Sequence, residues 1–553
     1  MKIETYLPRW TKSQKIEDSG RDPLGLARVH ERLTDWLVPG ITTQTDRARY
    51  YSFYLWSIYD TNRTDMPSNR RQFIEGMRRR EAVFVLSCLA HHDGVGPVDL
   101  VGVEKGSKIW KRDPKPRWFS TDFQPLPSNP LGGYSQYYGG SLYRLGLTHT
   151  PENANGVDQL TPGGRKVAEA FESSISRTQF LRGKHQVDDE LSFTVLRDLG
   201  NKACLCELPG TNGAERELLT NLFFGLDEFE NDDALLRRQT LLLCLDVIDF
   251  ANRSRMPIHE KDFDHSVLRE AAYFRQIGSD KKTIDYAPGG SLGICSERWR
   301  LVELHRYYAY VLETLFATIL SELEKARAGL SLDEFVSQLD WADMSAILKK
   351  WGRIPERNRL ADWLASIAGD REQIDKTMSR SFDRRVGLGA RLNEIDICDE
   401  TDETESPSKR IVLSLALLFT LYCRFYNSRA TDLWGSVSGL ARDDLWFDVT
   451  ARRIDNHLAR GSTVKEFLCD LIQKEVVDQH KLITVVEKGH IENSWLQLID
   501  GKLLWRRTYA PVWRSAKLEN CRKIICDLSL AKVNPKGTLS LTSRGRALQS
   551  QLL

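Results

Sequence analysis

The side chains best suited to catalysis or metal binding stand at spacings that the common motifs do not use. Cys204 and Cys206 are separated by one residue, whereas the paired cysteines of zinc sites are separated by two to four. His259-Glu260 is followed by His265, which is the wrong offset for the H-E-x-x-H motif of zinc proteases. His91-His92-Asp93 fits the polar end of a helix. These spacings predict no metal site and no cofactor.

Phosphate-binding and nuclease motifs also fail on spacing. Residues 102–108 lack the four residues that a P-loop needs between its glycines, and Gly94-x-Gly96 lacks the third glycine of a dinucleotide-binding loop. Pro97-Val98-Asp99 and Glu104-Lys105 lie too close together for a PD-(D/E)xK nuclease core. The sequence therefore identifies no catalytic residue. One enzymatic alternative stays open, a nucleic-acid hydrolase whose site is assembled from distant residues and includes part of 91–112.

Two stretches interleave cations with large aromatic rings. Cations neutralise phosphates and rings stack on exposed bases, so this composition is typical of nucleic-acid-binding surfaces. The predicted contact residues are Lys105, Lys108, Lys111 and Arg112 in a Gly/Pro-rich segment, and Trp505, Arg506, Arg507, Arg514, Lys517, Lys536 and Arg544 near the C-terminus. In the alternative interpretation the tryptophans belong to the core and the arginines extend outward to solvent.

The elements that must position these residues belong to a chain of ordinary globular composition. The 553 residues exceed what one core usually supports, so several domains are expected. Lys and Arg total 78 against 76 Asp and Glu, so any basic surface must be local. Ten scattered cysteines and a start without a signal peptide predict a reduced, cytoplasmic protein. The most apolar run, 411–426, is shorter than the roughly 20 residues that span a bilayer and predicts a buried helix.

Hydrophobic periodicity predicts a mainly α fold. Helices are expected over 46–59, 70–89, 165–185, 216–224, 235–252 and 299–326, and a capping box at Ser331 opens another. The Gly/Pro-rich residues 94–140 are predicted to form loops with short strands. The many Asp and Glu residues of 396–409 predict a solvated linker between domains.

Arg47 and Arg49 stand in the first turn of the predicted helix 46–59. Positive charge at that end opposes the helix dipole, so each arginine is expected to have an anionic partner. We expect a buried carboxylate, such as that of Asp46 or Asp60, rather than a phosphate.

Two segments repeat the phrase Leu-Thr-x-x-Gly-Arg after a predicted β-hairpin. One copy runs from Leu145 to a phrase that begins at Leu160, and the other runs from Leu528 to a phrase that begins at Leu541. In both, the threonine hydroxyl is expected to cap the helix that follows. This order resembles the winged-helix family of DNA-binding domains. The resemblance implies two small α+β units that bind DNA or, alternatively, dock proteins.

These features predict four regions. They are an N-terminal helical domain with a winged-helix-like unit over 1–185, a helical middle domain over 186–395, the acidic linker 396–409, and a C-terminal helical domain over 410–553 that ends in a second winged-helix-like unit.

The N-terminal phrase formed by 22–26, 39–42 and 47–54 resembles uncharacterised bacterial proteins of phage-defence and mobile-element loci. The resemblance implies no catalytic residue. We therefore expect a DNA-interacting, non-catalytic bacterial protein of a phage-defence or DNA-processing system, with a protein–protein scaffold subunit as a further alternative. The C-terminal copy is expected to be the one that contacts DNA, since the Trp/Arg stretch lies beside it.

Overall fold

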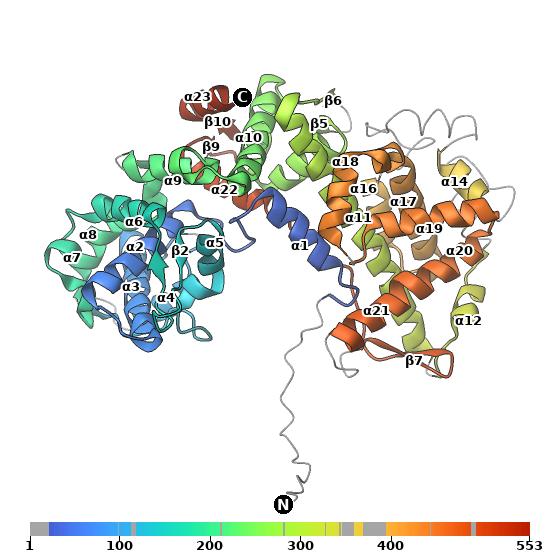
Figure 1. Ribbon diagram of the computed structural model, residues 1–553, viewed down its shortest axis with the longest axis horizontal. Helices are drawn as coiled ribbons and strands as arrows, with labels where there is room; N and C mark the ends of the chain where they lie inside the picture. Colours follow the sequence, from blue (N-terminus) through green and yellow to red (C-terminus); the bar gives the residue numbers. More distant parts are fainter. Residues whose placement is uncertain are drawn as a thin grey trace, which may run out of the picture. The chain divides into compact units, whose positions relative to one another are not determined.

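The computed structural model describes residues 22–97, 99–111, 118–210, 213–279, 282–326, 328–341, 344, 359–368, 394–442, 444–487 and 494–553 (Figure 1). The chain forms two compact units, each built from separate stretches of sequence. Unit 1 contains 1–31 and 304–514, and unit 2 contains 32–303 and 515–553. The predicted mainly α, multidomain fold is confirmed. The unit boundaries differ from the predicted domain limits because the last 39 residues belong with the N-terminal half.

Unit 2 is largely helical, and α1 and α11 continue from it into unit 1. Its helices are α1 (Leu26–Leu37), α2 (Ala48–Thr64), α3 (Arg70–His91), α4 (Val103–Trp110), α5 (Gly139–Arg144), α6 (Pro162–Ile175), α7 (Gln179–Arg182), α8 (Phe193–Ala203), α9 (Ala214–Phe224), α10 (Asp232–Arg253), α11 (Gly290–Lys325), α22 (Leu518–Asp527) and α23 (Ser543–Leu552). Short 3₁₀ or π turns are η1 (Tyr134–Tyr138), η2 (His185–Val187), η3 (Leu205–Gly210), η4 (Asp227–Phe229), η5 (Glu260–Asp262) and η6 (His265–Tyr273).

The strands of unit 2 form small antiparallel pairs. They are β1 (Trp118–Ser120) with β4 (Glu190–Ser192), β2 (Thr148–His149) with β3 (Gln159–Leu160), β5 (Gln276–Ser279) with β6 (Lys282–Asp285), and β9 (Ala531–Val533) with β10 (Leu539–Leu541). Such pairs have little stability of their own, so the packed helices must hold them.

Unit 1 contains further helices around the apolar α17. Its elements are α12 (Leu332–Ser337), α14 (Leu360–Ala368), α16 (Glu394–Glu403), α17 (Pro407–Phe425), η8 (Asn427–Ala430), α18 (Asp432–Ala441), α19 (Phe447–Arg460), α20 (Val464–Leu471), η9 (Ile472–Asp478), α21 (Gln479–Lys481), η10 (Leu482–Glu487), and the strand pair β7 (Leu496–Ile499) and β8 (Lys502–Trp505). The predicted buried helix is confirmed, since nearly all of α17 is buried. None of the described helices has the length and apolar character needed to cross a membrane.

The aromatic helix α2 is the centre of the N-terminal part of unit 2. It packs on α6, while α3 packs on α8 (Figure 1). Arg49 is fully buried and donates to Glu215 at 3.0 Å, and Arg47 donates to Asp527 at 3.0 Å. The expectation of carboxylate partners for both arginines is confirmed. The partners come from distant segments rather than from the neighbouring Asp46 or Asp60.

Two segments predicted to be irregular are helical. Within the predicted loop 94–140, α4 forms because Gly106 lets the helix lie close to α3, where an added Cβ would come within 2.5 Å of Val85. Within the predicted acidic linker, α16 forms because Ile397, Cys398 and Thr401 provide a buried face that packs toward α17. Acidic composition concealed this apolar face.

The two repeat copies share one local architecture, α5–β2–β3–α6 and α22–β9–β10–α23. Thr161 accepts a hydrogen bond from the Gly164 N–H at 3.2 Å, and Thr542 accepts one from the Gly545 N–H at 3.0 Å. Both predicted caps are confirmed. The hairpins and capped helices have the expected order, while DNA contact by either copy stays a prediction.

Candidate functional sites

Four side chains with metal-ligating atoms converge in unit 2. They are His91 and His92 at the end of α3, and Cys204 and Cys206 at the junction of α8 and η3. One ligand atom from each lies within 4.8 Å of every other. We call this set the His₂Cys₂ cluster. Imidazole nitrogens and thiolate sulfurs are the ligands that zinc prefers in proteins.

The close packing of α3 on α8 positions the cluster. Gly200 of α8 lies directly against the Ser87 carbonyl of α3, where the Cβ of any other residue would overlap that oxygen. The helices then end together. His91 is the last residue of α3 and His92 is its C-cap with non-helical backbone angles, so the adjacent imidazoles can both reach the cluster. Cys204 is the C-cap of α8, and η3 brings Cys206 back toward it.

Neighbouring polar groups orient the cluster. The His91 Nδ1 lies 2.8 Å from the Asn201 Oδ1, a contact that requires the proton on Nδ1 and leaves Nε2 as the lone-pair nitrogen. The His91 Nε2 lies 3.3 Å from a Glu207 oxygen, and the Cys206 Sγ lies 3.4 Å from the His92 Nε2. A carboxamide on the ring nitrogen opposite the metal, as Asn201 is, commonly fixes the tautomer of a metal-binding histidine.

The thiols of the cluster influence each other's protonation. Its hydrogen bond with Cys204, together with burial, raises the pKa of Cys206. The hydrogen bond with Cys206 lowers the pKa of Cys204, but the hydrogen bond with Cys88 and burial outweigh it and raise this pKa to about 12. Both sulfurs therefore carry protons at neutral pH when no cation is bound.

Sequence reasoning missed this cluster because it examined each half alone. The pair His91-His92 and the pair Cys204-x-Cys206 each fall short of a metal motif, and 111 residues separate His92 from the next ligand. The usable signal is that each pair marks the end of a helix with a buried body. Ends of packed helices can meet, so two incomplete ligand pairs deserve to be considered together.

Of the predicted nucleic-acid contacts of the N-terminal half, Lys105 and Lys108 lie on α4 and Lys111 is its C-cap. Lys105, Lys108 and Lys111 are exposed, and Arg112 lies outside the described residues. Gly106 faces α3, so the helix buries one side and presents its lysines on the other. Lys108 pairs with Glu104 at 2.7 Å, but both side chains are exposed, so this ion pair is weak. We call these three residues the α4 lysine stripe.

Of the predicted contacts in the C-terminal half, four lie in unit 1. Trp505, Arg506 and Arg507 are exposed at the end of β8, and Arg506 donates to the side chain of Gln497 at 2.6 Å. Arg514 is mostly buried and is held by two carboxylates, those of Glu313 and Asp22. Its burial and its two carboxylate partners make Arg514 a stabilising residue of unit 1.

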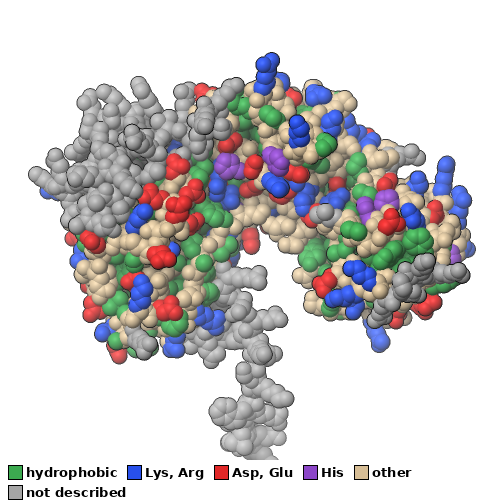
Figure 2. Space-filling view, turned by 180° about the vertical axis from the view of Figure 1, so that it is seen from behind, with side chains coloured by type: hydrophobic (Ala, Val, Ile, Leu, Met, Phe, Trp, Pro, Cys, Tyr) green, Lys and Arg blue, Asp and Glu red, His purple; other side chains and the backbone are tan. Residues whose placement is uncertain are grey.

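The other three contacts lie in unit 2 with the C-terminal copy. Lys517 is buried and paired with Asp35, and Arg544 is paired with Glu217. Lys536 is exposed in the hairpin turn. On the face shown in Figure 2, Lys and Arg side chains alternate with Asp and Glu side chains over the described surface and form no single large basic field. This mixture agrees with the near-neutral net charge.

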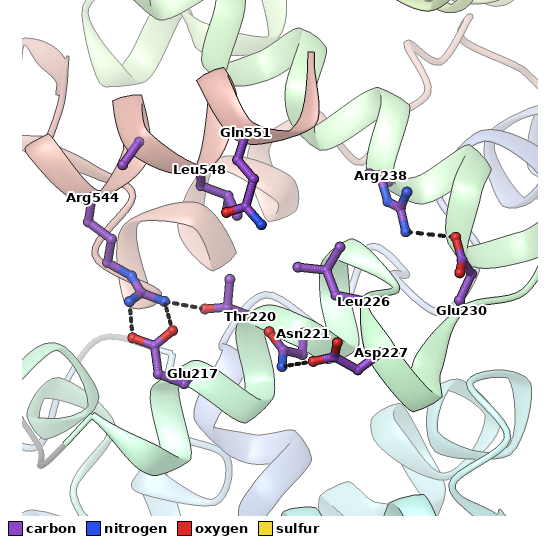
Figure 3. A pocket seen from close by; sticks show the side chains of 11 residues that line it. Glu217, Thr220, Asn221, Leu226, Asp227, Glu230, Arg238, Arg544, Leu548 and Gln551 are labelled. Atoms are coloured by element: carbon purple, nitrogen blue, oxygen red, sulfur yellow. Dashed lines mark hydrogen bonds and ion pairs between the residues drawn. The ribbon is translucent and has the colours of Figure 1, made fainter.

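Arg544 also lines a cavity of about 450 Å³ between α9, α10 and α23 (Figure 3). Figure 3 shows the charged side chains of this cavity turned toward one another. The Arg544 guanidinium faces Glu217 and Thr220, and Arg238 faces Glu230. These contacts pair both guanidinium groups within the cavity wall. The cavity is polar and carries one more carboxylate than guanidinium, because Glu217, Asp227 and Glu230 face only Arg238 and Arg544, so it does not favour an anionic ligand.

A comparison of the chain with family models, with curated proteins and with solved structures found no match. The function must therefore be argued from the residues.

Proposed function

We propose that this protein is a DNA-interacting, non-catalytic component of a bacterial phage-defence or DNA-processing system. The observation that carries the proposal is the α4 lysine stripe, three exposed cations on the open side of one helix. Lysines that neutralise phosphates supply most of the sequence-independent affinity for DNA.

The surroundings of α4 support a role in binding rather than in packing alone. Trp110 stacks on Phe119 at 4.8 Å between ring centroids, so the rings that hold α4 lie on its buried side. Trp118, the neighbour of Phe119 in β1, is 63% exposed. Successive strand residues point to opposite faces, so Trp118 is directed away from this core and is available to stack on a base.

The α4 lysine stripe is favoured over the C-terminal copy as the DNA contact. In the C-terminal copy, Lys517 and Arg544 are paired with carboxylates, and Lys523 of α22 pairs with Asp46. A paired cation must give up its carboxylate before it gains a phosphate.

Fluorescence anisotropy with a labelled duplex tests the proposal at a series of salt concentrations. One variant carries Lys105→Gln, Lys108→Gln and Lys111→Gln. Its matched control also removes three exposed cations, Lys532, Lys536 and Arg546, by substitution with Gln. We expect the α4 variant to lower the salt dependence, the slope of log K against log salt, by about 3, and the control to leave it unchanged.

Each other outcome has a meaning. If the wild-type chain binds neither duplex nor single-stranded DNA at low salt, the DNA proposal fails and a co-purifying protein favours the scaffold alternative. If only the control variant loses affinity, the C-terminal copy is the contact, as its sequence suggested. Cleavage of DNA in the presence of a divalent metal that is lost in His92→Ala favours the hydrolase alternative.

A further inference from the structure

We propose that His91, His92, Cys204 and Cys206 bind one Zn²⁺ ion as a four-ligand structural site in unit 2. The inference goes beyond the proposed DNA contact and does not depend on it. It concerns how the ends of α3 and α8 are joined.

The spacing of the four ligand atoms fits an ion at their centre. In a tetrahedral site with metal–sulfur bonds of about 2.3 Å, two sulfurs lie about 3.8 Å apart, and nitrogen ligands lie slightly closer. All four atoms already lie within 4.8 Å of one another. Closing the cluster onto an ion therefore needs displacements of under about 1 Å, which side-chain torsions supply without moving either helix.

The chemistry of the ligand set favours zinc. A tetrahedral set of two sulfurs and two imidazole nitrogens is typical of zinc, whereas magnesium, calcium and manganese prefer oxygen. On binding, each cysteine S–H bond breaks, a sulfur–zinc bond forms, and the proton passes to solvent. The two thiolates then neutralise the two positive charges of the ion. A neutral centre suits a site where Cys204 is fully buried.

The helix ends and polar side chains around the four ligands also favour a bound cation. The cluster stands at the C-terminal ends of α3 and α8, where the helix dipoles are negative. The Asn201 carbonyl accepts the His91 Nδ1 proton, so Nε2 can coordinate once the Glu207 carboxylate, 3.3 Å from it, turns away. Four protein ligands fill a tetrahedral shell and leave no position for water, so the site is structural rather than hydrolytic.

The site also has a defined mechanical role. Just past the cluster, Gly94 has a positive φ of 92° and lies against the Trp110 ring at the end of α4, where an added Cβ would overlap the indole. An ion held by His91 and His92 therefore fixes the turn on which the end of α4 rests, as well as the contact between α3 and α8.

The test is the metal content of the full, untagged chain, purified under reducing conditions and measured by elemental mass spectrometry. We expect one zinc per chain. Replacement of the ion by Co²⁺ should give a thiolate-to-cobalt charge-transfer band together with the intense visible bands of tetrahedral cobalt. Cys206→Ser and His92→Ala should each lose most of the zinc.

Two matched controls should retain the full metal content. They are Cys469→Ser, a half-buried thiol in unit 1, and His149→Ala, an exposed imidazole on β2. Circular dichroism shows whether each variant folds. If a cluster variant does not fold, the zinc content and the cobalt spectrum of the wild-type chain decide alone.

Wild-type chain with well under one equivalent of zinc and no thiolate–cobalt band would overturn the proposal. A stoichiometric metal other than zinc would overturn its identity. Zinc that persists in both cluster variants would place the ion elsewhere. The DNA measurement cannot mimic any of these results, because it reports on the charges of α4 and not on bound metal.

Discussion

The two copies of the Leu-Thr-x-x-Gly-Arg repeat share their internal hydrogen bonds and differ in their contacts with the rest of unit 2. In both, a residue with positive φ follows the first helix, Gly146 at 70° in one copy and Ser529 at 58° in the other. The next residue, Leu147 or Leu530, accepts a hydrogen bond from the backbone N–H of the capping threonine at 3.0 or 3.1 Å. The shared phrase therefore encodes one way of closing a hairpin onto a helix.

The difference lies at one matched position, the last residue of the first helix. In the N-terminal copy this residue is Arg144, whose ion pair with Asp233 has both side chains about half exposed. In the C-terminal copy it is Asp527, which accepts from Arg47 and from the Ala48 N–H and is nearly buried. At this matched position the N-terminal copy presents an exposed ion pair, whereas the C-terminal copy makes a nearly buried one with the N-cap residue of α2. Both copies pack on α2, the N-terminal copy through α6 and the C-terminal copy through α22.

This comparison shows that the repeat specifies a shape and that the neighbouring elements decide its use. The hairpin of the C-terminal copy is further covered, because Leu539 donates its N–H to the Ile258 carbonyl at 2.9 Å. A motif match by itself therefore predicts the cap and the turn but not a binding surface. We expect the C-terminal copy to stabilise unit 2.

The largest expected change in the free energy of unfolding is that of Asp527→Asn, for which Arg144→Gln is the matched variant in the other copy. Asp527→Asn removes the carboxylate that faces the mostly buried Arg47, and breaking such a pair costs about 3 kcal/mol. Arg144→Gln breaks an exposed ion pair and should cost under about 1 kcal/mol. Urea unfolding of the full chain, followed by tryptophan fluorescence, measures both.

Equal losses in the two variants would contradict the comparison, because they would mean that the two positions are equally anchored. Hydrogen exchange separates a local effect from a global one. Asp527→Asn should increase exchange in α22 and at the start of α2, whereas Arg144→Gln should affect only α5.

The sequence predicted the parts of this fold that depend on local order. Helical periodicity placed α2, α3, α9 and α10 to within five residues, and the capping box at Ser331 is present as predicted. The helix predicted over 299–326 begins nine residues earlier, at Gly290, and the helix predicted over 165–185 is divided into α6, α7 and η2. The threonine caps of both repeat copies were also predicted, since a cap involves residues only three positions apart. These features follow from neighbours along the chain.

Features that depend on long-range packing escaped prediction. The partner of Arg47 is 480 residues away, and the cluster joins residues more than 110 positions apart. Spacing along the chain carries no information on such pairs. Composition was misleading at α16, where the acidic residues conceal a buried stripe that only the contact with α17 explains.

The second prediction contrasts Asp527 with Glu81, a buried carboxyl group of α3. Among the described residues, no guanidinium lies in hydrogen-bonding range of Glu81; its Oε1 accepts from the Tyr54 hydroxyl at 2.6 Å and from the Gly133 N–H at 2.8 Å. Burial raises the pKa of Glu81 to about 7 from 4.5. The folded state thus holds a proton that the unfolded state releases, and stability falls as the pH rises from 4.5 to 7.

Glu81→Gln should remove this fall, because glutamine keeps the acceptor oxygen and cannot ionise. Linkage predicts that the free energy of unfolding of the wild-type chain falls by about 3 kcal/mol across that pH range. The variant should therefore become more stable relative to the wild-type chain as the pH approaches 8. Unfolding free energies measured at several pH values test this. The control Glu169→Gln changes an exposed carboxylate and should leave the wild-type profile intact. If the unfolding free energies of Glu81→Gln and of the wild-type chain change in parallel with pH, Glu81 is not the group responsible for the fall.

The smallest predicted effect tests what the two copies share. Gly164 and Gly545 each lie directly against a carbonyl, that of Leu147 or Leu530, and a Cβ at either position would overlap the oxygen. Relief requires the helix to move off the hairpin, so Gly164→Ala and Gly545→Ala should each cost about 1 to 3 kcal/mol. Gly140→Ala in α5, where nothing lies within 4 Å, should be neutral or stabilise by up to about 1 kcal/mol.

Because the same atoms clash in both copies, the two losses should be similar even though the surroundings differ. A loss of stability in Gly545→Ala without one in Gly164→Ala would mean that the surroundings of the C-terminal copy, and not the Leu-Thr-x-x-Gly-Arg phrase itself, make glycine necessary. Similar losses would assign the glycine to the closure of the hairpin onto its helix. The requirement for glycine would then hold wherever this phrase follows a hairpin, whatever surface the copy presents.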